Sequence, residues 1–158
     1  MRHESEFLLT PQPRASCLLK MADKIRLRVV TPSRLLLDED VDEVTAHGEL
    51  GEFGVLPNHI AFLSTLVPGE LSYKQGATKR TLVVSGGYAE VLNNVMTVLA
   101  PAAEFSSEVD VSRAERAKAR AEKEMAETDH DRPEFNVAED AYHRAVARLE
   151  VASKEARR

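Results

Sequence analysis

A change of hydrophobic period divides this chain into two parts with different secondary structure. In the first part, apolar residues recur at every second position. Ile25, Leu27 and Val29 alternate with arginines, which places the three apolar side chains on one face of a strand. After Pro101 the apolar residues recur at steps of three and four, the spacing of one face of an α-helix. The sequence therefore predicts a β domain followed by a helical segment.

Further strand-like runs follow the first one up to Leu99, and residues typical of turns separate them. The predicted strands span residues 34–37, 41–46, 60–66, 70–74, 79–85, 88–92 and 95–99. The predicted turns lie at Pro68-Gly69, Gly76, Gly86-Gly87 and Asn93-Asn94, and the last pair suits a tight turn because asparagine tolerates positive φ. Short strands at this spacing predict an all-β sandwich.

Residues 51–59 have the sequence Gly-Glu-Phe-Gly-Val-Leu-Pro-Asn-His. Two glycines and a proline within nine residues favour a turn-rich corner between strands over a strand or a helix. A rigid β scaffold can hold such a corner in place while its side chains stay accessible. This corner, with Glu52 and His59, is therefore a candidate contact surface for a partner.

Two helices are predicted after residue 107. Asp110 or Ser112 can cap the first helix, and Ser112 with Glu115 has the spacing of a capping box. A polar segment at 128–134, which contains Pro133, separates the helices, so they are expected to form an antiparallel hairpin. The apolar stripes are Ala114, Ala117, Ala121 and Met125 on the first helix, and Ala138, Ala141, Ala145, Leu149, Ala152 and Ala156 on the second.

The predicted seam between the two helices consists mainly of alanine. A buried methylene contributes about 0.8 kcal/mol, so an alanine seam gains several-fold less than a leucine seam. Alanine also has the highest helix propensity. The sequence thus predicts well-formed helices that are weakly held together and that a partner could displace. A static two-helix cap on the sandwich agrees with the same periodicity.

Residues 1–21 follow neither period and contain Pro11 and Pro13. The apolar run at 7–9 is too short for the core of a signal peptide. We expect a poorly ordered extension, with Met21 as an alternative start, and a short targeting tail is the other interpretation.

Composition and motifs argue against several classes of protein. A net charge of −5 is unlike the basic stripe of a nucleic-acid-binding protein. A single cysteine, Cys17, allows no internal disulfide and fits a reducing compartment. No apolar run reaches the roughly 18 residues of a membrane span, so no direct membrane insertion is expected. The nucleotide-binding P-loop, His-Glu-x-x-His and Gly-x-Ser-x-Gly are all absent, and we expect no catalytic residue.

No metal site is expected either. The acidic residues at 38–43 lack the spacing and the central glycine of a calcium loop, so a solvated turn explains them better. His47 and His59 have no neighbours in the sequence with the spacing of metal ligands.

Arginines border the predicted groove between the helices. Arg144 and Arg148 lie four residues apart, each one residue before a seam position, and Asp110 and Arg113 share a face of the first helix. Planar guanidinium groups beside an alanine-lined groove suit a phosphate and a flat ring, which makes the groove a candidate nucleotide site. The alternative is a solvated surface of charge pairs that contribute little stability.

Residues 22–156 resemble the epsilon subunit of the bacterial and chloroplast F-type ATP synthase. The resemblance rests on the order and spacing of several matching stretches. The sequence departs from the family pattern at two positions: Ala61 stands where many members have proline, and Val109 stands where isoleucine or leucine is usual. The matching stretches are Val29-Val30-Thr31-Pro32, the Gly-Glu-x-Gly-x-x-Pro-x-His corner at 51–59, Ser85-Gly86-Gly87-Tyr88-Ala89-Glu90-Val91, Val95-x-Thr97-Val98-Leu99, Val109-Asp110-x-x-Arg113-Ala114 and Arg144-Ala145-x-x-Arg148-Leu149.

The resemblance implies a β-sandwich over residues 22–106 that binds the gamma subunit and the c ring, and a regulatory helical hairpin over residues 107–158. It implies a non-catalytic rotor subunit of the central stalk, peripheral to the cytoplasmic face of the bacterial inner membrane. The hairpin of this family can extend into the alpha/beta catalytic head and inhibit ATP hydrolysis.

The resemblance also implies functional residues. Glu52 would lie nearest the c ring, and Glu52 and His59 would belong to the c-ring and gamma contacts. No cofactor is required, but ATP can bind the compact hairpin as a regulator. Independently of the resemblance, the alternative function is a free-standing ATP-sensing module. The residues that match the family's ATP contacts are Glu104, Val109, Asp110, Arg113, Ala114, Arg120, Arg144 and Arg148.

Overall fold

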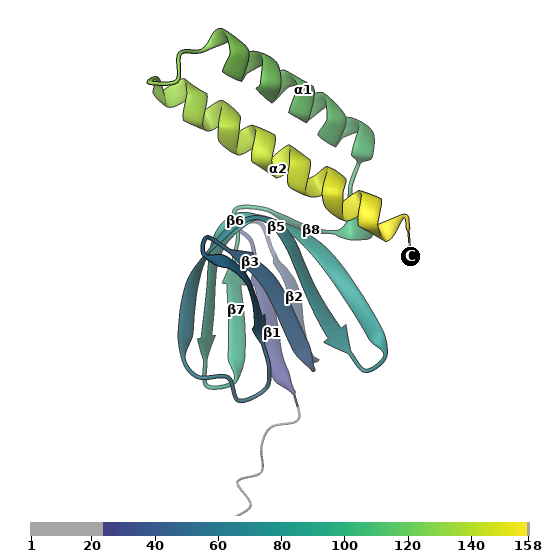
Figure 1. Cartoon of the computed structure of the whole chain (residues 1–158). Coiled ribbons are helices and arrows are strands. Elements are labelled where there is room, and N and C mark those ends of the chain that lie inside the picture. Colours follow the sequence, from purple (N-terminus) through teal and green to yellow (C-terminus); the bar gives the residue numbers. More distant parts are fainter. Residues whose placement is uncertain (1–23, 158) are drawn as a thin grey trace, which may run out of the picture.

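A computed structural model describes residues 24–157 and shows a β-sandwich with a helical hairpin at one end (Figure 1). This confirms the predicted fold class, whereas the extension expected at 1–21 lies outside the described residues. The strands are β1 (Ile25–Val30), β2 (Leu35–Val41), β3 (Glu43–Gly48), β4 (Gly51–Val55), β5 (Phe62–Gln75), β6 (Thr78–Leu92), β7 (Val95–Leu99) and β8 (Ala103–Phe105). A 3-10 turn, η1 (Ser106–Glu108), leads into the helices α1 (Val111–Glu127) and α2 (Pro133–Glu155).

The strands follow the order β2-β1-β7-β6-β5-β3-β4, and β8 pairs with β6. All pairs are antiparallel except β1 with β7. The long strands β5 and β6 pair along their whole length, and β7 joins β6 at residues 88–92 whereas β3 joins β5 at residues 66–74. The paired strands β5 and β6 therefore form a long two-stranded ribbon, which pairs with β7 along one half and with β3 along the other. Since β7 and β3 belong to different layers, the ribbon runs through both layers of the sandwich.

Two of the predicted turns are wrong, because they are bends inside these long strands. Pro68 pairs with Ser85 and Leu66 with Gly87, so the ladder continues through both predicted turns. Gly87 has φ +118°, and a Cβ atom there would lie 2.0 Å from the carbonyl oxygen of Leu99. Glycine and proline therefore bend the ribbon from one layer into the other without ending its hydrogen bonding.

The predicted turns at Gly76 and at Asn93-Asn94 are confirmed. The two asparagines have φ of 50° and 61° and connect β6 to β7. The corner at 51–59 needs a correction, because its first five residues form β4, which pairs with β3 and buries Val55 against the core. The irregular segment lies after β4 and runs from Leu56 to Ala61, where β5 follows.

The acidic residues at 38–43 are not a solvated turn, because most of them lie on strands. Asp38 and Asp40 on β2 face the arginines of β1, and the Arg26 Nε atom lies 2.6 Å from Asp38 Oδ1. Arg26 also pairs with Asp40 at 3.3 Å, and Arg28 pairs with Asp38 at 3.2 Å. Charges of opposite sign across neighbouring strands stabilise the pairing.

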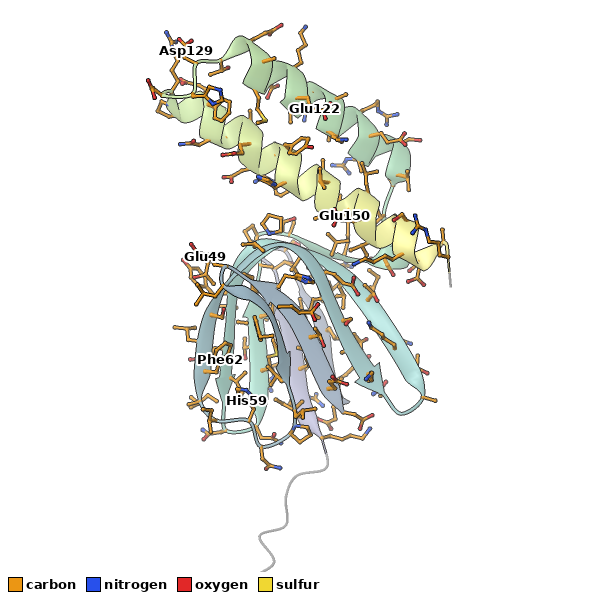
Figure 2. The ribbon with its side chains drawn as sticks, in the orientation of Figure 1. Glu49, His59, Phe62, Glu122, Asp129 and Glu150 are labelled. Atoms are coloured by element: carbon orange, nitrogen blue, oxygen red, sulfur yellow. The ribbon has the colours of Figure 1, made fainter. Side chains whose placement is uncertain are left out.

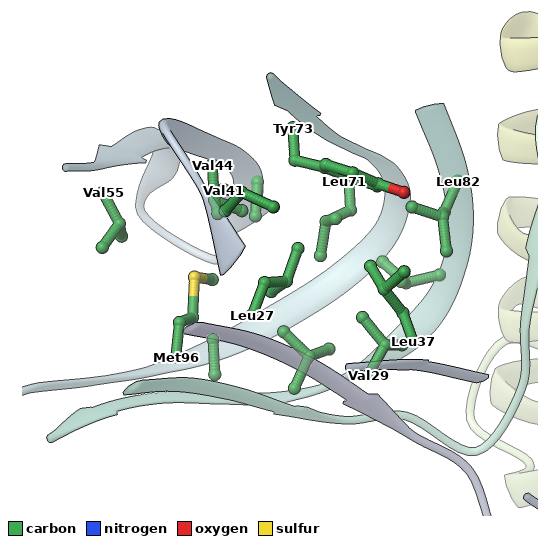
Figure 3. Close-up of a cluster of buried hydrophobic side chains, with 14 of the residues drawn as sticks. Leu27, Val29, Leu37, Val41, Val44, Val55, Leu71, Tyr73, Leu82 and Met96 are labelled. Atoms are coloured by element: carbon green, nitrogen blue, oxygen red, sulfur yellow. The ribbon is translucent and has the colours of Figure 1, made fainter. Parts of the chain in front are cut away.

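Aliphatic side chains fill the space between the layers (Figure 3). Ile25, Leu27 and Val29 are fully buried, which confirms the alternation predicted for the first strand. Each of these side chains contributes about 1.5–3 kcal/mol on burial. Tyr73 is the large aromatic residue of this core, and among the described residues its hydroxyl group has no hydrogen-bond partner. Burial raises the pKa of Tyr73.

The helices begin where capping chemistry allows. The carboxylate of Asp110 accepts a hydrogen bond from the backbone N–H of Arg113 at 2.9 Å, so Asp110 and not Ser112 caps α1. A capping box between Ser112 and Glu115 is therefore not formed. Pro133 occupies the first turn of α2, where its missing N–H costs nothing.

The alanine seam between α1 and α2 is confirmed except at Ala156, which is exposed and follows the end of α2. Ala114 and Ala121 on α1, together with Ala138 and Ala145 on α2, are each 1–2% exposed. The helices run side by side in opposite directions (Figure 1).

Candidate functional site

Helix α2 packs on the end of the sandwich through a second, smaller apolar surface (Figure 1). Ala147 and Val151 pack with Val83 of β6, and Val109 packs against this group. Sequence reasoning missed this contact, although two signals pointed to it. Ala147 and Val151 lie four residues apart, so they share a face of the helix that is not the seam. Val83 is an apolar residue at a strand position whose side chain points away from the core.

Polar contacts surround this apolar surface. Arg148 Nε donates to Glu104 Oε1 of β8 at 2.6 Å, and the two side chains are only 27% and 29% exposed. Near the end of α2, Lys154 Nζ donates to Glu70 Oε2 of β5 at 2.8 Å. This carboxylate raises the pKa of Lys154. The docked position of α2 thus depends on one small apolar contact, on ion pairs at two places and on a hydrogen bond of 3.1 Å from Ser106 Oγ of η1 to Glu155 Oε2.

A cavity of about 310 Å³ lies between the two helices and the end of the sandwich. Its volume is at the lower end of the range of small-molecule sites. Seven of the eight expected nucleotide contacts line this cavity, while Val109 instead packs beneath α2. The lining residues are Glu104, Glu108, Asp110, Arg113, Ala114, Ala117, Arg120, Ala141, Arg144, Ala145 and Arg148.

Four arginines and three carboxylates share the lining, and their partners differ. Arg148 is held by Glu104, and Arg120 lies 3.8 Å from Glu124 on its own helix. Arg113 and Arg144 form no ion pair within residues 24–157, so their guanidinium groups are free to meet an anion. Four alanines of the two helices, Ala114, Ala117, Ala141 and Ala145, line the cavity beside these arginines and make up its alanine floor.

Glu108 is a lining residue that sequence reasoning missed. Its Oε2 atom accepts a hydrogen bond from the backbone N–H of Phe105 and lies 4.0 Å from Arg34 Nη2. The signal available in the sequence was its position two residues before the capping Asp110.

Within residues 24–157, no three His, Cys, Asp or Glu side chains come together as metal ligands would. No helix in this part of the chain has the length and apolar character that crossing a membrane requires.

The two candidate contact residues of the 51–59 corner lie at different ends of the sandwich. Glu52 is on β4 opposite His47, close to the β3–β4 turn, and the His47 Nε2 atom lies 3.5 Å from Glu52 Oε2. His59 follows β4, and its ring contacts Phe62 edge-on. Figure 2 shows Glu49 of the β3–β4 turn at the end that faces α2, and His59 with Phe62 toward the opposite end.

Exposed apolar residues lie in the loop that carries His59 and on the outer face of β5, β6 and β7, where the exposed Glu90 lies among them. Tyr88 pairs with Leu99 across β6 and β7, and both side chains are more than half exposed. Exposed apolar patches on a folded domain mark interaction surfaces. The residues of this apolar face are Leu56, Ile60, Leu63, Tyr88, Leu92 and Leu99.

Both parts of the chain match family models. Residues 24–106 match the model of the beta-sandwich domain of the ATP synthase delta/epsilon chain, and residues 107–153 match the model of its long alpha-helix domain.

Curated relatives agree with these matches. The chain is 57% identical over 134 residues to the ATP synthase epsilon chain of Syntrophobacter fumaroxidans, an alignment that covers 85% of this chain and 99% of the relative. It is 46% identical over 138 residues to the ATP synthase epsilon chain of Geotalea daltonii, covering 87% of this chain and the whole relative.

Solved structures share the fold. A chain in the Euglena gracilis mitochondrial ATP synthase (OSCP/F1/c-ring) matches with a TM-score of 0.72 and 24% identity, covering 87% of this chain and 84% of that one. A chain in the Tetrahymena thermophila mitochondrial ATP synthase (central stalk/c-ring) matches with a TM-score of 0.57 and 17% identity, covering 82% and 94%. With two consecutive family models and relatives aligned over nearly their whole length, this chain belongs to the ATP synthase delta/epsilon family and is similar throughout to its epsilon chains.

Proposed function

We propose that this chain is a non-catalytic central-stalk subunit of an F-type ATP synthase that couples the gamma subunit to the c ring and restrains ATP hydrolysis through its helical hairpin. The observation that carries this proposal is the small docking contact of α2. Burial of Val83, Ala147 and Val151 contributes roughly 4–6 kcal/mol before the entropy cost of ordering. A partner that offers a larger apolar surface can therefore displace the hairpin.

The separation of Glu52 from His59 supports two different partners at the two ends of the sandwich. The apolar face that begins near His59 suits a protein partner with an apolar surface, and we assign it to gamma. The exposed Glu52 at the β3–β4 end suits a polar, basic contact, and we assign it to the c ring. The identity to epsilon chains of ATP synthase supports this placement.

In this role the subunit has no catalytic site of its own and is peripheral to the cytoplasmic face of the bacterial inner membrane. The 57% identity to a bacterial epsilon chain supports this location.

The cavity between the helices suits ATP as a regulatory ligand. Arg113 of α1 and Arg144 of α2 face it from the two helices and can pair with phosphate oxygens. The alanine floor can accept the flat base. A ligand that contacts both helices and binds only the closed hairpin stabilises it by about 1.4 kcal/mol at ten times its dissociation constant. ATP would thereby favour the docked, non-inhibitory position.

A free-standing ATP-sensing module is the second candidate, because this cavity is built by a single chain. The two candidates differ in whether gamma binds. A pull-down of gamma by the folded full-length chain supports the stalk subunit, and failure of that pull-down leaves the sensing module.

Deletion of residues 110–158 tests the inhibitory role. The truncated chain keeps β8 and η1, so it should still assemble with gamma, and the ATPase activity of the assembled complex should rise. An unchanged rate of hydrolysis contradicts the inhibitory role of the hairpin.

Calorimetric titration of the full-length chain with ATP, with and without magnesium, tests the ligand. Arg144→Ala combined with Arg148→Ala should abolish binding. Arg116→Ala combined with Arg157→Ala removes the same charge from exposed positions outside the cavity and should leave the affinity unchanged. Equal affinity of the first double variant and the parent chain would exclude this cavity.

A further inference from the structure

The end of the docked hairpin and the β3–β4 end of the sandwich share a chain of polar contacts. Lys154 of α2 pairs with the carboxylate of Glu70 at 2.8 Å. The backbone carbonyl oxygen of Glu70 lies 3.1 Å from Nδ1 of His47, and Nε2 of that ring lies 3.5 Å from the carboxylate of Glu52. Four residues from α2, β5, β3 and β4 therefore connect the hairpin to the proposed ring contact.

Glu52 also adds a negative charge near the end of α2, without contacting Lys154. The Glu70 carboxylate has the largest effect in raising the pKa of Lys154, and the carboxylates of Glu150 and Glu52 add to it. Glu52 therefore favours a cation at the end of α2 in the docked position. Glu150 lies on α2 itself and moves with Lys154, whereas Glu52 stays with the sandwich.

Glu52 is also accessible to a partner, because its side chain is 61% exposed while that of Glu70 is 13% exposed. A basic group that approaches this end can therefore reach the carboxylate of Glu52 more readily than that of Glu70. Such a group would cancel part of the negative charge that acts on Lys154.

We infer that contact of a basic group of the c ring with Glu52 and docking of α2 through Lys154 oppose each other. A cation at Glu52 weakens docking, and by thermodynamic reciprocity the docked Lys154 weakens the affinity of Glu52 for that cation. The inference rests on the proposed function only in naming the c ring as the partner. Through this coupling, docking of the hairpin depends on whether the subunit is in contact with the c ring.

Thiol labelling of the isolated full-length chain tests the coupling. Ala147→Cys in a Cys17→Ser background places the reporter thiol in the docking contact, where the residue is 5% exposed. The labelling rate then follows the undocked fraction. Glu52→Gln should raise this rate by less than about fivefold, which is the upper limit for an exposed charge pair in direct contact.

Glu49→Gln is the matched control, because it removes the same charge from the turn that precedes β4. It should leave the labelling rate unchanged. In a Lys154→Met background, Glu52→Gln should lose its effect, which a merely structural role of Glu52 would not predict. Equal effects of the two glutamine variants, or an effect of Glu52→Gln that persists without Lys154, would overturn the coupling.

Binding to a purified gamma–c-ring subcomplex tests the reciprocal effect. Lys154→Met should tighten binding by less than about fivefold when Glu52 is present and leave it unchanged in Glu52→Gln. An equal gain in both backgrounds overturns the inference. If no variant binds the subcomplex while the labelling result stands, the proposed function fails and the coupling between Glu52 and α2 remains.

Discussion

The ion pair between Arg148 and Glu104 should control how firmly the hairpin stays on the sandwich. The atoms are 2.6 Å apart, and Arg148 Nη2 also lies 3.5 Å from Ser85 Oγ. A hydrogen bond between charged groups contributes about 1.5–3 kcal/mol, whereas exposed pairs contribute about 0.2–1 kcal/mol. Since both side chains are less than one third exposed, we expect a contribution of about 1–2 kcal/mol to docking.

Arg148→Gln or Glu104→Gln should therefore raise the undocked fraction roughly 5- to 30-fold, since a factor of ten corresponds to about 1.4 kcal/mol. The measurement is the labelling rate of the thiol in Ala147→Cys, without ATP. The double variant completes a double-mutant cycle and should give a coupling energy of about 1–2 kcal/mol.

Arg144→Gln is the control, because Arg144 lies one turn before Arg148, lines the same cavity and forms no ion pair within residues 24–157. It should leave the labelling rate unchanged when no nucleotide is present. A coupling energy below about 0.3 kcal/mol, or an equal effect of Arg144→Gln, would refute the assignment of the docking contact to this pair.

Two further predictions concern the sandwich. Gly87→Ala should lower the free energy of unfolding, measured in urea, by about 3 kcal/mol or more, because the new Cβ would lie 2.0 Å from the carbonyl oxygen of Leu99. Gly76→Ala is the control: it has φ +61° and open space around it, so it should lower the free energy of unfolding by only about 1–2 kcal/mol. The Arg26 guanidinium lowers the pKa of Asp38 below its ordinary 3.8, so this pair stabilises the fold above pH 3.8 and loses its effect as the pH falls through the lowered pKa. Asp38→Asn should therefore flatten the acid limb of the stability profile, and an unchanged limb would show that the pair makes no contribution.

Local patterns explain why much of the fold could be predicted. Apolar residues alternate with polar ones in the first strand and recur every three or four residues in the helices. Each pattern predicts which face of the element is buried, and these faces are buried in the structure. Helix capping is also local, but the sequence offered two candidate caps, Asp110 and Ser112. The choice between them required the structure, in which the N–H of Arg113 donates to the carboxylate of Asp110. The spacing of Arg144 and Arg148 on one helix likewise placed both beside the groove.

The errors arose where the outcome depends on distant residues. Pro68 and Gly87 are typical of turns, yet the partner strand continues its hydrogen bonds past both positions and converts the expected turns into bends. Asp38 belongs to an acidic run that suggests solvent exposure, but Arg28 lies opposite it across the ladder and Arg26 Nε lies 2.6 Å from its Oδ1. Local sequence cannot state which residue lies across a ladder.

By itself, the sequence determined the two-part architecture, the alanine seam of the hairpin and the groups available for an anion between its helices, because hydrophobic period and helix geometry act over a few residues. Only the tertiary structure decided that α2 rests on Val83 and is held by Glu104 and Glu70, and that Glu52 and His59 lie at opposite ends of the sandwich. These features depend on how strands far apart in the chain pair and bend. A hydrophobic pattern specifies that a face will be buried, but the partner that buries it follows from the packing of the whole domain.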